Sequence, residues 1–130
     1  MMTSREWAAD CRKYAEQYKD LAKWDLEQID YYNGEIEYLG REIAKERKAC
    51  RDIVKRVWAQ GVLTRFEMAH YSDPAKYQSS ALQKLLRDRR QAYRWRKACR
   101  EQAEHEKAEA AHWESKAAYW ESKAEGSGEA

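Results

Sequence analysis

The chain from Arg87 to its end contains no leucine, isoleucine or valine, the residues that supply most protein cores. All 14 of these residues lie between Leu21 and Leu86, beside 6 Trp, 9 Tyr and 1 Phe in the whole chain. A thick globular core cannot be built from this distribution, whereas a thin pair of helices can. We therefore expect an all-α protein folded as a long, antiparallel, coiled-coil-like two-helix hairpin.

Capping signals predict where the helices begin and end. A capping box pairs a Ser or Thr with a Glu three residues later, and a glycine often follows the last helical residue. The signals are Thr3 with Glu6, Gly61, Thr64 with Glu67, and Asp73 with Pro74. They predict helices over residues 4–60, 65–71 and 74–124. Residues 1–125 then form one domain, with the short helix at the turn, and residues 126–130 form a flexible tail.

Apolar residues recur in steps of three and four, which is the spacing of a coiled-coil seam. The first helix shows Trp7, Cys11, Tyr14, Tyr18 and Leu21, a slip near Asp25, and then Ile29, Tyr32, Ile36, Leu39, Ile43, Cys50, Ile53 and Val57. The last helix shows Leu82, Leu85, Arg89, Ala92, Arg96, Cys99, Ala103, Glu106, Ala110, Trp113, Ala117 and Trp120. Folding the helices back pairs Tyr14 with Trp120 and Tyr32 with Ala103, and large residues on one helix tend to face alanine on the other. Because such a core is thin, we expect two hairpins to dimerise into a four-helix arrangement.

Charge is segregated along the chain although the net charge is only +2. Residues 1–40 carry a net charge of −4 and residues 101–130 of −5, whereas residues 41–65 carry +5 and residues 84–100 carry +7. The predicted basic patch consists of Arg87, Arg89, Arg90, Arg94, Trp95, Arg96 and Lys97 with Lys48, Arg51 and Lys55. Arginine suits phosphate and tryptophan can stack on a base, so this patch favours nucleic-acid binding. A solvated helix face is the alternative interpretation.

An aromatic stripe on the first helix predicts a second contact surface. Trp24, Tyr31 and Tyr38 are spaced by sevens, about 100° around the helix from the seam. Tryptophan and tyrosine are enriched in the centres of protein interfaces, so the stripe favours partner binding or self-association. The alternative is that the three side chains flank the seam and are half-buried against the last helix.

No pattern in the chain indicates an enzyme. His105, Glu109 and His112 share a helix face, but no fourth ligand accompanies them, so we expect a solvated face and no metal. Phosphate loops and nucleophile elbows are absent. Two thin helices also offer no concave pocket, so we expect neither a cofactor nor a small-molecule substrate.

The remaining features concern location. No segment approaches the ~20 apolar residues of a membrane span, so we expect no membrane contact. Cys11, Cys50 and Cys99 are odd in number and widely spaced, which favours free thiols in a reducing compartment, the cytoplasm. We expect a non-enzymatic accessory protein that binds another protein as an adaptor, inhibitor or assembly factor. Nucleic-acid binding is the alternative, and a purely structural oligomer is a third possibility.

Overall fold

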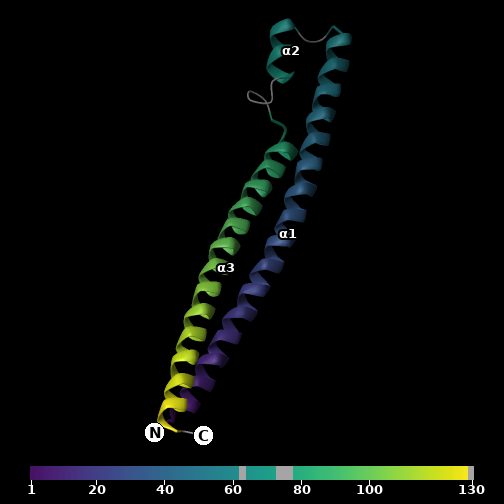
Figure 1. The fold of residues 1–130 in the computed structure, drawn as a ribbon. Coiled ribbons are helices and arrows are strands. Elements are labelled where there is room, and N and C mark those ends of the chain that lie inside the picture. The colour runs from purple at the N-terminus through teal and green to yellow at the C-terminus, as the bar shows by residue number, and fades with distance from the viewer. Residues whose placement is uncertain (62–63, 73–77, 129–130) are drawn as a thin grey trace. The chain divides into compact units, whose positions relative to one another are not determined.

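The computed structural model describes residues 1–61, 64–72 and 78–128. It contains helices α1 (Ser4–Ala59), α2 (Arg65–Ser72) and α3 (Ser80–Ser127), and no strand among the described residues. The long helices α1 and α3 run antiparallel as a hairpin with α2 at the turn (Figure 1). The predicted all-α hairpin is therefore confirmed.

Side-chain caps hold the helix ends as the sequence predicts. The N–H of Glu6 donates to Oγ1 of Thr3 at 3.2 Å at the start of α1. At α2 the box is reciprocal, because the N–H of Glu67 donates to Oγ1 of Thr64 at 3.1 Å and the N–H of Thr64 donates to Oε1 of Glu67 at 3.3 Å. Gly61 follows α1 with a φ of 71°, a left-handed conformation that favours glycine.

The last helix differs from its predicted bounds at both ends. Residues 78 and 79 are not helical, so α3 begins at Ser80 and not at residue 74. Its cap is Ser79, whose Oγ accepts a hydrogen bond from the backbone N–H of Leu82 at 3.1 Å. The predicted cap at Asp73 and Pro74 lies outside the described residues. At the other end, α3 continues past residue 124 to Ser127, and Gly128 is the glycine with positive φ, at 74°.

Contacts within the chain form two compact bodies. The first body comprises Met1–Tyr31 with Arg96–Ala130, and the second body comprises Tyr32–Trp95. By sequence, the first body carries a net charge of −4 and the second of +6.

The core of the first body is built mainly from alanines of both helices. The buried side chains are Ala8, Cys11, Ala15, Ala22 and Asp25 on α1, and Ala103, Glu106, Ala110, Ala117 and Ala124 on α3. The alanines that the predicted seam of the last helix includes in this body, Ala103, Ala110 and Ala117, are all buried. On α1, however, the predicted seam residues Trp7, Tyr14 and Leu21 remain 44%, 43% and 49% exposed. At these three positions the next residue, Ala8, Ala15 or Ala22, is buried instead, whereas Cys11 is buried as predicted.

The predicted slip near Asp25 is also wrong. Asp25 keeps the three-and-four spacing between Ala22 and Ile29, and it is itself 5% exposed. The α1 seam therefore runs through this position without interruption. A charged residue inside the seam was mistaken for a break in it.

Aromatic rings beside the alanine core determine how the two helices of the first body are paired. Trp7 stacks on Trp120 with ring centroids 6.1 Å apart, and Tyr14 lies 5.0 Å from Trp113. The predicted pairing of Tyr14 with Trp120 is therefore wrong by one heptad. Because both pairs are spaced by sevens, this register lets both aromatic contacts form together.

The second body holds the aliphatic part of the core. Leu39, Ile43 and Val54 of α1 and Leu82 of α3 are buried, whereas Ile53, predicted to lie in the seam, is 51% exposed. Tyr32 packs edge-on against Trp95 at 5.7 Å, not against Ala103 as predicted. The aliphatic residues thus lie next to the turn, as the sequence indicates.

Candidate functional site

The aromatic stripe, defined as Trp24, Tyr31 and Tyr38, lies on the surface of α1. The three side chains are 58%, 59% and 51% exposed, respectively. Trp24 and Tyr31 belong to the first body and Tyr38 to the second. Just over half of each side chain is therefore accessible. Large aromatic side chains in this environment are available for a further contact.

Acidic side chains accompany the stripe in the first body. Asp20, Glu27 and Asp30 are exposed, and none of them forms an ion pair with another described residue. Lys23 is the one basic residue between positions 20 and 31. The surface around Trp24 and Tyr31 is therefore both aromatic and negatively charged.

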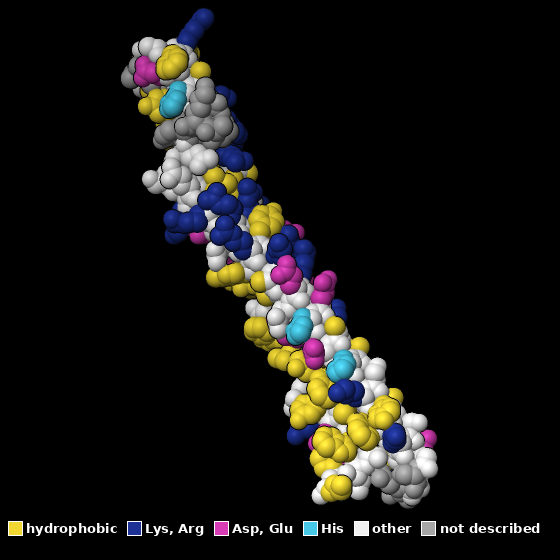
Figure 2. Space-filling view, turned by 90° about the vertical axis from the view of Figure 1, so that its left-hand side faces the viewer, with side chains coloured by type: hydrophobic (Ala, Val, Ile, Leu, Met, Phe, Trp, Pro, Cys, Tyr) yellow, Lys and Arg dark blue, Asp and Glu magenta, His cyan; other side chains and the backbone are white. Residues whose placement is uncertain are grey.

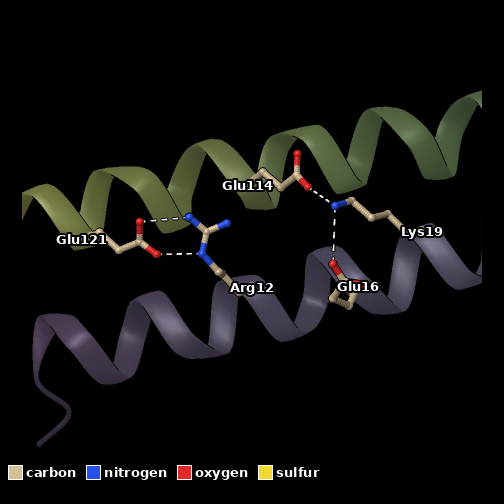
Figure 3. A network of polar contacts seen from close by, with 5 residues as sticks. All are labelled: Arg12, Glu16, Lys19, Glu114 and Glu121. Atoms are coloured by element: carbon tan, nitrogen blue, oxygen red, sulfur yellow. Dashed lines mark hydrogen bonds and ion pairs between the residues drawn. The ribbon is translucent and has the colours of Figure 1, made fainter.

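By contrast, Glu114 and Glu121 of α3 are paired with cations of α1 (Figure 3). Arg12 donates two hydrogen bonds to Glu121, from Nε at 2.7 Å and from Nη2 at 2.9 Å. This bond raises the pKa of Arg12 and lowers the pKa of Glu121. Lys19 bridges Glu114 and Glu16, and its hydrogen bond with Glu114 raises the pKa of Lys19. These exposed pairs align α1 and α3 and add little stability.

The predicted basic patch is largely exposed, and Lys and Arg side chains gather in one region of the face shown in Figure 2. Arg87, Arg90 and Arg94 follow the three-and-four spacing on the outer face of α3 and form no ion pair with a described residue. We call these three residues the arginine stripe. Half-buried members of the patch are Arg89 and Arg96, which occupy seam positions.

The other members of the patch have local partners or are exposed. Lys48 pairs with Asp52 at 3.1 Å, and Lys97 lies 3.9 Å from Glu101. Arg51 and Lys55 are exposed on α1. Trp95 is 50% exposed and makes a T-shaped ring contact with Tyr32. Its stacking capacity is thus partly used within the second body.

A buried acidic pair in the first body was missed by sequence reasoning. Asp25 and Glu106 are 5% and 4% exposed, and their side chains are within hydrogen-bonding reach of each other. Oε1 of Glu106 accepts a hydrogen bond from Gln102 at 3.2 Å, whereas its Oε2 is buried without a partner among the described residues. Two carboxylates can share a hydrogen bond only if one carries a proton. Burial raises the pKa of Glu106, and the bond with Asp25 adds to this effect.

The three cysteines are free thiols, as predicted. Cys11 is buried, and Cys50 and Cys99 are half-buried. Burial raises the pKa of Cys99, and the charge of Asp25 raises it further. Such a thiol is a poor nucleophile at neutral pH.

One groove departs from the expectation that two helices offer no concavity. It encloses about 370 Å³ in the second body and is lined by Glu46, Cys50, Ile53, Val54, Val57, Tyr71 and Ser79. The groove exists because Tyr71 of α2 adds a third wall beside α1 and Ser79. Oε1 of Glu46 accepts a hydrogen bond from the hydroxyl of Ser79 at 3.1 Å and lies 3.7 Å from Sγ of Cys50.

Within residues 1–61, 64–72 and 78–128, no three potential metal ligands are grouped so that they could hold an ion. This includes His105, Glu109 and His112, which share a face of the last helix. None of the described helices combines the length and apolarity needed to cross a membrane. No known protein family, curated protein or solved structure matches this chain.

Proposed function

We propose that this chain is a non-enzymatic accessory protein of the cytoplasm that binds another protein through the aromatic stripe. It would act as an adaptor, inhibitor or assembly factor by occupying a surface of its partner. The observation that carries the proposal is the exposure of Trp24, Tyr31 and Tyr38, each above one half. The three free thiols support a reducing location.

The character of the stripe supports a protein partner. Tryptophan and tyrosine bury a large area and lose little side-chain entropy, so they dominate the energetics of many interfaces. A rigid helix also presents them without a folding cost. The acidic residues beside Trp24 and Tyr31 would steer a basic partner and increase its association rate.

Binding can be tested with a stripe variant that carries Trp24→Ala, Tyr31→Ala and Tyr38→Ala. Wild type and variant are used as baits in native lysate treated with nuclease, and captured proteins are quantified. A matched control carries Phe66→Ala and Tyr119→Ala, two aromatic residues that are 81% and 53% exposed elsewhere. We expect a specific protein to be retained by wild type and control and lost by the stripe variant. If wild type, the stripe variant and the control retain the same proteins in equal amounts, the proposal is refuted.

Nucleic-acid binding is the second candidate, and the arginine stripe is the observation that favours it. Three guanidinium groups that form no ion pair with a described residue are available for phosphate oxygens. The variant Arg87→Glu, Arg90→Glu and Arg94→Glu should abolish binding of a single-stranded oligonucleotide in fluorescence anisotropy. Wild-type affinity should fall steeply with salt, by a slope of about −0.7 for each phosphate contact in a log–log plot. Weak wild-type binding without this salt dependence would exclude the candidate.

A further inference from the structure

We infer that the acidic, aromatic surface at residues 20–31 binds the arginine stripe of a second copy of this chain. The inference rests on the proposed function, because it takes the aromatic stripe to be a protein-binding face. It identifies what covers that face when the protein self-associates.

The first half of the contact is a linear array on α1. Asp20, Glu27 and Asp30 follow helical steps along one line, and Trp24 and Tyr31 lie on the neighbouring line. All five side chains are exposed, and the three carboxylates lack an ion-pair partner among the described residues. In the same body, Glu121 and Glu114 of α3 are instead paired with Arg12 and Lys19 of α1. The charges beside the aromatic side chains are therefore those still available to a partner.

The second half is the arginine stripe on α3. Arg87, Arg90 and Arg94 are separated by steps of three and four, whereas the three carboxylates are separated by steps of seven and three, with Lys23 and Trp24 in the longer interval. At ~1.5 Å per residue, residues 20–30 and residues 87–94 span roughly 15 Å and 10 Å along their helices. The two lines therefore overlap in length and carry opposite charge.

Charge decides between the two ways in which copies of this chain can meet. Pairing the aromatic stripe with itself would bring the carboxylates of Asp20, Glu27 and Asp30 near those of the other copy, with Lys23 alone to offset them. Like charges across an interface disfavour binding. Pairing with the arginine stripe instead brings guanidinium groups near these carboxylates, and a guanidinium can bond a carboxylate with two parallel N–H groups. The same guanidinium groups can stack on Trp24 and Tyr31.

A charge-swap experiment tests the contact directly. The lysine variant carries Asp20→Lys, Glu27→Lys and Asp30→Lys, and the glutamate variant carries Arg87→Glu, Arg90→Glu and Arg94→Glu. Wild type should associate in nuclease-treated samples by sedimentation equilibrium, and added salt should weaken the association. Each variant alone should associate at least tenfold more weakly, and an equimolar mixture of the two should recover the association.

The control carries Glu101→Lys, Glu104→Lys and Glu125→Lys, which makes the same change in charge at exposed positions of α3 in the first body. It should associate within about twofold of wild type, and circular dichroism should show unchanged helix in every variant. The inference is overturned if wild type is monomeric, if either swap variant alone associates normally, or if mixing fails to recover association. If wild type is monomeric but the alanine variant of the aromatic stripe still fails to capture a protein that wild type captures, this inference alone is overturned. If wild type is monomeric and the alanine variant captures the same proteins as wild type, the proposed function is overturned as well.

Discussion

The buried pair of Asp25 and Glu106 predicts that Glu106→Gln stabilises the protein at neutral pH. Glutamine keeps the size of the side chain, and its amide can still accept the hydrogen bond from Gln102. The amide nitrogen then occupies the place of Oε2, the buried atom without a partner, and can donate to Asp25. The substitution thus supplies the hydrogen that the two carboxylates otherwise obtain only from a bound proton.

The expected magnitude follows from burial and from the shape of the body. Leaving a buried polar atom unsatisfied costs about 1–3 kcal/mol. Both side chains are at most 5% exposed, but water lies only about one side chain away in a body of two helices. We therefore expect a gain of about 1–2 kcal/mol at pH 7, from the lower part of that range. The corresponding rise in Tm is roughly 4 °C per kcal/mol.

The gain should depend on pH with a defined sign. Because the pKa of Glu106 is raised in the folded protein, the folded chain holds a proton that the unfolded chain releases. The stability from this proton is complete below the ordinary glutamate value of 4.5 and is lost as pH rises through the raised pKa. Wild type and Glu106→Gln should therefore be nearly equal at pH 4 and differ at pH 7.

Urea denaturation followed by circular dichroism at both pH values measures this difference. Glu104→Gln is the matched control, because Glu104 is exposed on the same helix and its substitution should change stability little at either pH. An equal gain for Glu106→Gln at pH 4 and pH 7, or a loss of stability at pH 7, would show that Glu106 does not hold a shared proton.

Further predictions concern packing, backbone and thiol chemistry. Ala117 is 0% exposed, so Ala117→Leu should destabilise by about 1–3 kcal/mol in urea denaturation, whereas Ala118→Leu at the exposed neighbour should change little. Gly34 lies inside α1 with open space around its Cα, so Gly34→Ala should raise the free energy of unfolding by roughly 0.5–1 kcal/mol. Gly61→Ala should lower it by about 1 kcal/mol because its φ is 71°, and stabilisation by both glycine substitutions would contradict this account. Cys99 should react more slowly with iodoacetamide at pH 7 in the folded protein than in urea, as detected by peptide mass spectrometry, because its pKa is raised.

The local signals of the sequence are sufficient for the helices and for part of the candidate site. Three-and-four spacing, together with the caps at Thr3, Thr64 and Gly61, predicts α1 and α2 to within one residue. The spacing by sevens that places Trp24 away from the seam also predicts its exposure. These features depend on backbone geometry and on hydrogen bonds between near neighbours, so the chain specifies them without reference to its fold.

Only the tertiary structure decides which of two adjacent lines on α1 forms the seam. Trp7, Tyr14 and Leu21 have the same period as Ala8, Ala15 and Ala22, and hydrophobicity alone favours the larger residues. The alanines are buried because alanines also occupy the facing positions of α3, which allows the helices to approach closely. This choice depends on both helices at once.

The same dependence explains the buried acidic pair. Asp25 has the spacing of a seam residue, but its charge indicates a surface position until Glu106 and Gln102 are known to lie beside it. Spacing along one helix determines a direction around its axis, whereas burial depends on what the other helix places there. The sequence by itself therefore determines the helices and the spacing of the aromatic stripe along α1. The packing of α1 against α3 decides the register, the alanine seam and the environment of Glu106.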